Sequence, residues 1–189
     1  MISIGVTGHR ILAETAKIEA GIAEALMFIE HTFPDQTFAA ISSLAEGADR
    51  LVVRQILSRP QARLFVPLPL QESDYLNDFA TEESKAEFRH LLNQAKEVVD
   101  LPPAPTREEA YESAGRYVLQ HCDILVAVWD GQEAQGMGGT GGIVARARIK
   151  KLPITWIHAG NRNPETGEPT SLGKEQGKVS YENFTEGKP

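Results

Sequence analysis

Short apolar runs alternate with longer amphipathic stretches along most of this chain. The runs are rich in β-branched residues, which favour strands, whereas the longer stretches repeat apolar residues at helical spacing. In the first long stretch, Ile18, Ile22, Ala25, Leu26 and Ile29 fall on one side of a helix. The pattern predicts strands near residues 2–6, 37–41, 62–68, 97–101, 123–129 and 153–158. It predicts helices near residues 13–31, 47–57, 82–95, 107–121 and 141–150.

Alternation of strand and helix is typical of an α/β fold in which helices cover both faces of a mainly parallel sheet. We therefore predict a Rossmann-like three-layer αβα domain over residues 1–159, with a nucleotide-binding role. From Gly160 onward the chain is rich in Asn, Gly, Pro, Glu and Lys. This composition predicts that residues 160–189 form a polar C-terminal tail that packs little or is disordered.

Composition narrows the classes of partner. The formal net charge of −7 argues against nucleic acid and anionic membrane surfaces, because both favour a basic protein face. The single cysteine, Cys122, and five unpaired histidines give no support for a metal site or a disulfide. The chain shows no signal-peptide pattern and no apolar run that could span a bilayer. We expect a cytoplasmic protein that uses no metal and no cofactor.

Candidate functional residues lie where the expected strands end, because open parallel sheets bind ligands outside the carboxyl ends of their strands. Thr7, Gly8, His9 and Arg10 follow the first strand. A glycine beside a small residue lets backbone amides approach a phosphate, while Thr7 adds a hydroxyl. Arg10 can form a bidentate pair with phosphate, and His9 can donate to phosphate or ribose. The alternative is a tight turn with a surface arginine.

A second candidate segment follows the second strand and contains Ser42, Ser43, Glu46 and Gly47. Two hydroxyls and a glycine precede a helix there, and a helix N-terminus attracts anions. Glu46 can accept hydrogen bonds from ribose hydroxyls, whereas Asp49 falls in the first helical turn. The alternative is that Ser43 caps the helix and the acids only complement its dipole.

The third candidate segment, residues 130–142, follows the most apolar strand and holds six glycines in thirteen residues. Such a loop has little side-chain bulk and adopts positive φ easily, so it can cradle phosphate. The candidate ligand contacts are Asp130, Gly131, Gly138, Gly139 and Thr140. No Walker motif or first-strand GxGxxG is present. A flexible surface loop is the alternative. Lesser candidates are Pro67, Tyr75, Asp78, Tyr111, Arg116 and Tyr117.

Taken together, the segments 5–10, 43–49, 128–131 and 138–140 resemble the SLOG superfamily over about residues 1–158. These Rossmann-like nucleotide-binding proteins are related to the LOG phosphoribohydrolases, and the last segment is also similar to nucleoside 2-deoxyribosyltransferases. The resemblance implies ligands that contain a ribose phosphate, a homodimer, and N-glycosidic bond chemistry in the enzymatic branches.

Position 143 separates two functional hypotheses. The resemblance places the essential carboxylate of both enzyme groups on Ile143, which cannot act as one. We therefore expect a sensor or carrier that binds a nucleotide or a nucleotide-derived ligand. The alternative is an N-glycosidic hydrolase or transferase acting on nucleosides or nucleoside 5′-monophosphates, with Glu46 or Asp130 as the tentative catalytic residue. A scaffold with a vestigial pocket is a third possibility.

Overall fold

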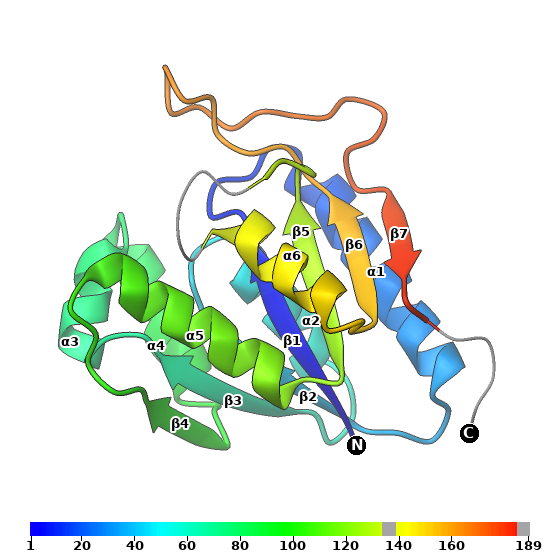
Figure 1. Cartoon of the computed structure of the whole chain (residues 1–189), viewed down its shortest axis with the longest axis horizontal. Coiled ribbons are helices and arrows are strands. Elements are labelled where there is room, and N and C mark those ends of the chain that lie inside the picture. The colour runs from blue at the N-terminus through cyan, green and yellow to red at the C-terminus, as the bar shows by residue number, and fades with distance from the viewer. Residues whose placement is uncertain (134–138, 185–189) are drawn as a thin grey trace.

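The computed structural model describes residues 1–133 and 139–184 and contains a seven-stranded sheet in the order β4-β3-β2-β1-β5-β6-β7 (Figure 1). All neighbouring strands are parallel except β6 and β7. The strands are β1 (Ile2–Gly8), β2 (Phe38–Ile41), β3 (Arg63–Leu68), β4 (Glu97–Asp100), β5 (Ile124–Trp129), β6 (Ile154–His158) and β7 (Val179–Glu182). The helices are α1 (Thr15–Thr32), α2 (Ala48–Leu57), α3 (Glu72–Tyr75), α4 (Glu82–Leu92), α5 (Arg107–His121) and α6 (Thr140–Ile149), with a 3-10 turn, η1 (Leu76–Asp78).

Helices cover both faces of the sheet, which confirms the predicted three-layer α/β architecture (Figure 1). Strand β5, beside the central strand β1, shows why, because all of its side chains are buried. Its even-numbered residues pack in the core formed with α1 and α2, whereas the odd-numbered residues pack in the core formed with α5 and α6. Successive strand residues point to opposite faces, so a continuous apolar strand needs a helical layer on each side.

The strand order reverses direction at β1 and β5. From β1 the chain moves outward through β2, β3 and β4, and then returns through α5 to place β5 on the other side of β1. Helix α1, which follows β1, packs on one face of the sheet, whereas α6, which follows β5, packs on the other. The loops after β1 and β5 therefore diverge and leave a crevice at the carboxyl ends of these two strands.

The C-terminal segment packs against the domain, so the prediction of a loosely packed tail after Gly160 is wrong. Residues 179–182 pair with β6 as strand β7, and Tyr181 stacks near Phe28 of α1 with ring centres 4.0 Å apart. Gln176 is 5% exposed and accepts hydrogen bonds from the backbone amides of Gly160 and Leu172. Polar composition misled the prediction because the buried Gln176 side chain and the pairing of β7 with β6 hold this segment to the domain.

None of the helices within residues 1–133 and 139–184 is both long enough and apolar enough to cross a membrane.

Candidate ligand-binding site

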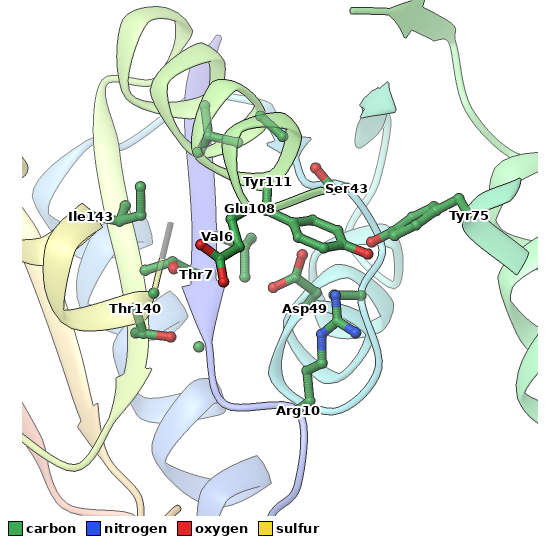
Figure 2. Close-up of a pocket in the computed structure, with 16 residues that line it drawn as sticks. Val6, Thr7, Arg10, Ser43, Asp49, Tyr75, Glu108, Tyr111, Thr140 and Ile143 are labelled. Carbon is green, nitrogen blue, oxygen red and sulfur yellow. The ribbon is translucent and has the colours of Figure 1, made fainter. Parts of the chain in front are cut away.

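A cavity of about 350 Å³ opens at the carboxyl ends of β1 and β5, where the strand order reverses. This volume falls in the range of small-molecule sites, roughly 300–1,000 Å³. We call it the switch-point cavity, and Figure 2 shows its lining side chains. The lining residues are Val6, Thr7, Gly8, Arg10, Ser43, Ala45, Asp49, Tyr75, Glu108, Tyr111, Ala114, Gly115, Val118, Gly139, Thr140 and Ile143. All three sequence segments singled out above therefore contribute to one cavity.

The end of β1 forms the floor of the cavity. Thr7 and Gly8 both line it, although they belong to the strand itself and not to the following loop as expected. A Cβ atom on Gly8 would lie 2.4 Å from the Cβ of Ala48 and 2.7 Å from the carbonyl oxygen of Val128. Glycine at this position therefore lets β1, α2 and β5 approach one another closely, which is a structural reason for it.

Arg10 brings a positive charge to the cavity. Its side chain is exposed, and the guanidinium carbon lies 5.1 Å from the centre of the Tyr111 ring. Among the residues that the structure describes, Arg10 forms no ion pair. Arg10 therefore lines the cavity without a carboxylate partner among these residues (Figure 2).

His9 does not line the switch-point cavity but joins the β1 and β5 loops beneath it. Its Nε2 accepts a hydrogen bond from the backbone amide of Asp130 at 3.1 Å and lies 3.3 Å from the Asp130 carboxylate. Burial lowers the pKa of His9, although the carboxylate acts in the opposite direction. An accepting Nε2 and a lowered pKa both favour a neutral ring. His9 thus supports the site from below.

The two serines after β2 have different roles. Ser43 lines the cavity, and its hydroxyl donates to the carbonyl of Pro67 at 2.8 Å. Ser42 is fully buried beneath the cavity and donates to Oδ2 of Asp49 at 2.7 Å. Gly47, with φ +76, packs so tightly that a Cβ atom would lie 2.3 Å from the carbonyl oxygen of Arg10. Ser42 and Gly47 therefore shape the site without lining it.

Asp49 is a carboxyl group at the cavity wall with an unusual environment. The residue is only 7% exposed, and burial raises its pKa from 3.8 to about 6. The hydrogen bond from Ser42, the charge of Arg10, a backbone hydrogen bond at Ala45 and the charge of Arg50 all lower the pKa and offset part of that rise. Asp49 therefore changes charge close to neutral pH in a cavity that also contains Arg10.

Glu46 points away from the switch-point cavity. Its carboxylate accepts hydrogen bonds from the backbone amide of Ala80, at 3.1 Å, and from the hydroxyl of Ser84. The hypothesis that Glu46 contacts ribose or acts in catalysis therefore loses its geometric basis. Its position after β2 was predicted, but sequence position alone does not give the direction of a side chain.

The loop after β5 contributes the N-terminus of α6. Gly139 and Thr140 line the cavity, whereas Gly138 lies outside the described residues. Within the described residues, α6 has no side-chain cap and no acidic residue in its first turn. The first backbone amides of a ten-residue helix thus lack a capping side chain where the cavity begins, which is favourable for an anion.

Asp130 and Gly131 are structural residues of the same loop. Oδ1 of Asp130 accepts a hydrogen bond from the backbone amide of Gln132 at 3.0 Å, in addition to its contact with His9. Gly131 has φ +83, and a Cβ atom there would approach the Trp156 ring to 3.1 Å. In the described part of the chain neither residue lines the cavity, so a catalytic role for Asp130 also loses its geometric basis.

Another wall of the cavity comes from α3 and α5, which do not follow β1, β2 or β5 in the chain. Tyr75 of α3 and Glu108 and Tyr111 of α5 face the cavity (Figure 2). Burial raises the pKa of Tyr75, and Tyr111 donates its hydroxyl to Asp78. Only the tyrosines had been candidates, and Glu108 was missed. Its signal in the sequence was weak, because an acid in the first turn of a helix normally complements the dipole.

Ile143 lines the cavity as an apolar residue. It packs against Gly115 of α5, where a Cβ atom would lie 2.3 Å from Cδ1 of Ile143. Position 143 thus faces the cavity, but it presents no charge to a ligand.

Neither protein-family models nor curated proteins match this chain. Across residues 1–133 and 139–184, no three His, Cys, Asp or Glu side chains are grouped so that they could hold a metal ion.

Proposed function

We propose that the chain binds a nucleotide or a nucleotide-derived ligand in the switch-point cavity and acts as a sensor or carrier. The observation that carries this proposal is the convergence of the β1 end, the β2 loop and the α6 N-terminus on one cavity. A sheet of this topology binds ligands at its switch point, and an uncapped helix N-terminus together with a free arginine suits a phosphate group.

The other walls of the cavity suit the uncharged parts of a nucleotide. Tyr75 and Tyr111 provide aromatic surface, while Ala114, Val118 and Ile143 provide aliphatic surface. Small-molecule sites typically combine an apolar lining with a few directed polar groups. We place the phosphate near Gly139 and Thr140 and the base against the α5 wall.

Substitution of Arg10 tests the proposal. A thermal-shift screen of nucleotides identifies ligands, because binding to the folded state alone raises the melting temperature. For each ligand found, Arg10→Ala should weaken affinity about 10- to 100-fold by calorimetry, since a hydrogen bond to a charged group contributes about 1.5–3 kcal/mol. Arg89→Ala is the matched control, because Arg89 is exposed on α4 and its substitution removes the same charge as Arg10→Ala. Equal affinities of the two variants would refute the assignment of Arg10.

Asp49 supports a second candidate function, N-glycosidic bond cleavage. General acids need a pKa near the working pH, and the pKa of Asp49 is about 6 at the wall of the cavity. Ile143 argues against fast turnover, because it offers no charge to an oxocarbenium-like transition state. Base release from nucleoside 5′-monophosphates should therefore be slow or absent in the wild type. Fast release that Asp49→Asn abolishes would show that the protein is an enzyme.

We further propose a homodimer that forms through the exposed faces of α5 and α6. Ile149 of α6 is 82% exposed, and it lines a shallow depression with Leu119 of α5. Isolated exposed apolar residues are ordinary, so the support for the dimer comes from the apolar lining that Ile149 shares with Leu119 in this depression. The cationic rim of this depression consists of Arg116, Arg146 and Lys150.

A further inference from the structure

A carboxylate that has no partner among residues 1–133 and 139–184 faces the switch-point cavity. Glu108 lies in the first turn of α5, and Figure 2 shows its side chain directed into the cavity. Within the part of the chain that the structure describes, this carboxylate forms no ion pair or hydrogen bond. The acidic residues around it do have partners: Asp74 and Asp78 with Arg107, Glu109 with Thr106, and Glu112 with Arg146.

The position of Glu108 constrains which part of a ligand it can meet. A carboxylate repels a phosphate group, so the phosphate belongs near the α6 N-terminus and not beside Glu108. Carboxylate oxygens are pure hydrogen-bond acceptors, and their natural partners are paired hydroxyl donors. In a nucleotide, the vicinal 2′- and 3′-hydroxyls of ribose are such a pair, and they lie on the face of the sugar ring opposite the base and the 5′-phosphate arm.

Asp49 does not fit this role equally well. Its carboxyl group lines the cavity but is largely buried, and Oδ2 already accepts a hydrogen bond from the hydroxyl of Ser42. Glu108, in contrast, is exposed at the cavity and has both oxygens available. Of the two carboxyl groups that line the cavity, Glu108 is therefore the one that can accept two hydrogen bonds from a ligand.

We propose that Glu108 accepts hydrogen bonds from the ribose diol and so makes the cavity selective for ribonucleotides over 2′-deoxyribonucleotides. This inference rests on the proposed nucleotide-binding function. The selectivity arises because a deoxyribose removes one donor from the pair and leaves a carboxylate oxygen of Glu108 without its partner. A hydrogen bond to a charged group of this kind corresponds to about a 10-fold or larger difference in affinity.

The test compares the dissociation constants of the four ribonucleoside 5′-monophosphates with those of their 2′-deoxy counterparts. The wild type should bind the ribonucleotides about 10-fold more tightly. Glu108→Gln should lose most of this ratio, because an amide presents one acceptor in place of two. Glu109→Gln is the matched control, since Glu109 occupies the same helical turn and is bonded to Thr106. It should keep the full ratio.

The ratio separates diol recognition from simple electrostatics. If Glu108 acts only by repelling phosphate, Glu108→Gln will tighten both nucleotide series equally and leave the ratio unchanged, which overturns the inference. A wild type that binds both series equally overturns it as well. If no nucleotide of either series binds, the proposed function itself fails. Glu108→Asp, which keeps the charge but withdraws it by one methylene, should lose part of the ratio.

Discussion

At the scale of single residues, the buried pair of Ser42 and Asp49 explains how the β2 loop holds its shape beneath the cavity. Ser42 donates to Asp49 and accepts from the backbone amide of Leu44, which has φ +58. These bonds stabilise a loop conformation that a non-glycine residue adopts at a cost. Asp49 retains a raised pKa because burial outweighs the hydrogen bond and the two neighbouring arginines.

The raised pKa of Asp49 predicts a pH dependence of stability. The folded state holds the Asp49 proton up to about pH 6, whereas the unfolded state releases it near pH 3.8. The folded state therefore binds more protons between these values, and stability falls as the pH rises from about 4 to about 6. Above that window the free energy of unfolding is lower by about 3 kcal/mol, since each pKa unit corresponds to about 1.36 kcal/mol.

Asp49→Asn removes this titration while keeping an acceptor for Ser42. Urea unfolding of both proteins from pH 4 to 7.5 measures the effect. The stability of the variant relative to the wild type should increase across pH 4–6 and stay constant above it. A difference that does not change with pH would show that Asp49 titrates normally.

Sequence position indicated which residues reach the site, but not which side chains face it. Thr7, Ser43 and Thr140 line the cavity as their places at strand ends suggest. His9 and Glu46 lie in the same segments, yet they bind Asp130 and Ser84 instead. The direction of a side chain depends on local backbone turns and on neighbours far away in the chain. The pattern of residues within one segment does not show which distant neighbours its side chains will meet.

At the scale of elements, the C-terminal segment is held to α1 by two closely packed glycines. A Cβ atom on Gly21 would lie 2.2 Å from the carbonyl oxygen of Gly177. Gly177 itself has φ +84, and a Cβ atom there would lie 2.3 Å from the carbonyl oxygen of Lys17. Helix α1 and the loop before β7 therefore touch through their backbones. This contact couples the terminal strand to the core.

Gly177→Ala should be clearly destabilising. The added methyl group meets backbone atoms of α1, in addition to the strain of a left-handed conformation, which is about 1–2 kcal/mol for non-glycine residues. Gly167→Ala is the control, because Gly167 has φ +74 but no atom within 4 Å of the position of its Cβ. The melting temperature of Gly177→Ala should fall below that of Gly167→Ala. Equal values would indicate that the C-terminal loop packs loosely.

The strands and long helices were predictable from periodicity, whereas the short elements were not. Strand β7 contains Val179, Ser180, Tyr181 and Glu182, which offer little apolar content to signal a strand. Helix α3 spans four residues of an acidic segment between the predicted strand at 62–68 and the predicted helix at 82–95. Both elements form because tertiary contacts stabilise them: β7 adds to the edge of β6, and Tyr75 of α3 is fully buried.

At the scale of the whole molecule, the proposed dimer predicts the effect of a single charge. Ile149→Glu places a carboxylate on the exposed face of α6 and should convert the dimer to a monomer in light scattering. Met27→Glu is the control, because Met27 is 58% exposed on α1, which covers the other face of the sheet. It should leave the mass unchanged. A wild type that is monomeric at high protein concentration would refute the dimer.

The topology of the sheet explains why three distant segments meet. Strand β1 lies between β2 and β5, so the segments that follow these three strands share one edge of the sheet. Alternating strands and helices made this arrangement predictable, and the cavity does lie there. The α5 wall was harder to foresee, because α5 precedes its strand and lines the site along much of its length, from Glu108 to Val118.

The most direct test of nucleotide binding in the switch-point cavity is a titration of isotope-labelled protein with a ribonucleoside 5′-monophosphate, followed by amide chemical shifts. The account predicts the largest shifts at Thr7, Gly8 and Ser43 and at residues 139–143, the positions at which the ligand meets the backbone. Arg10→Ala should require more ligand for the same shifts. Saturable shifts confined to another surface, or none at millimolar nucleotide, would contradict the account.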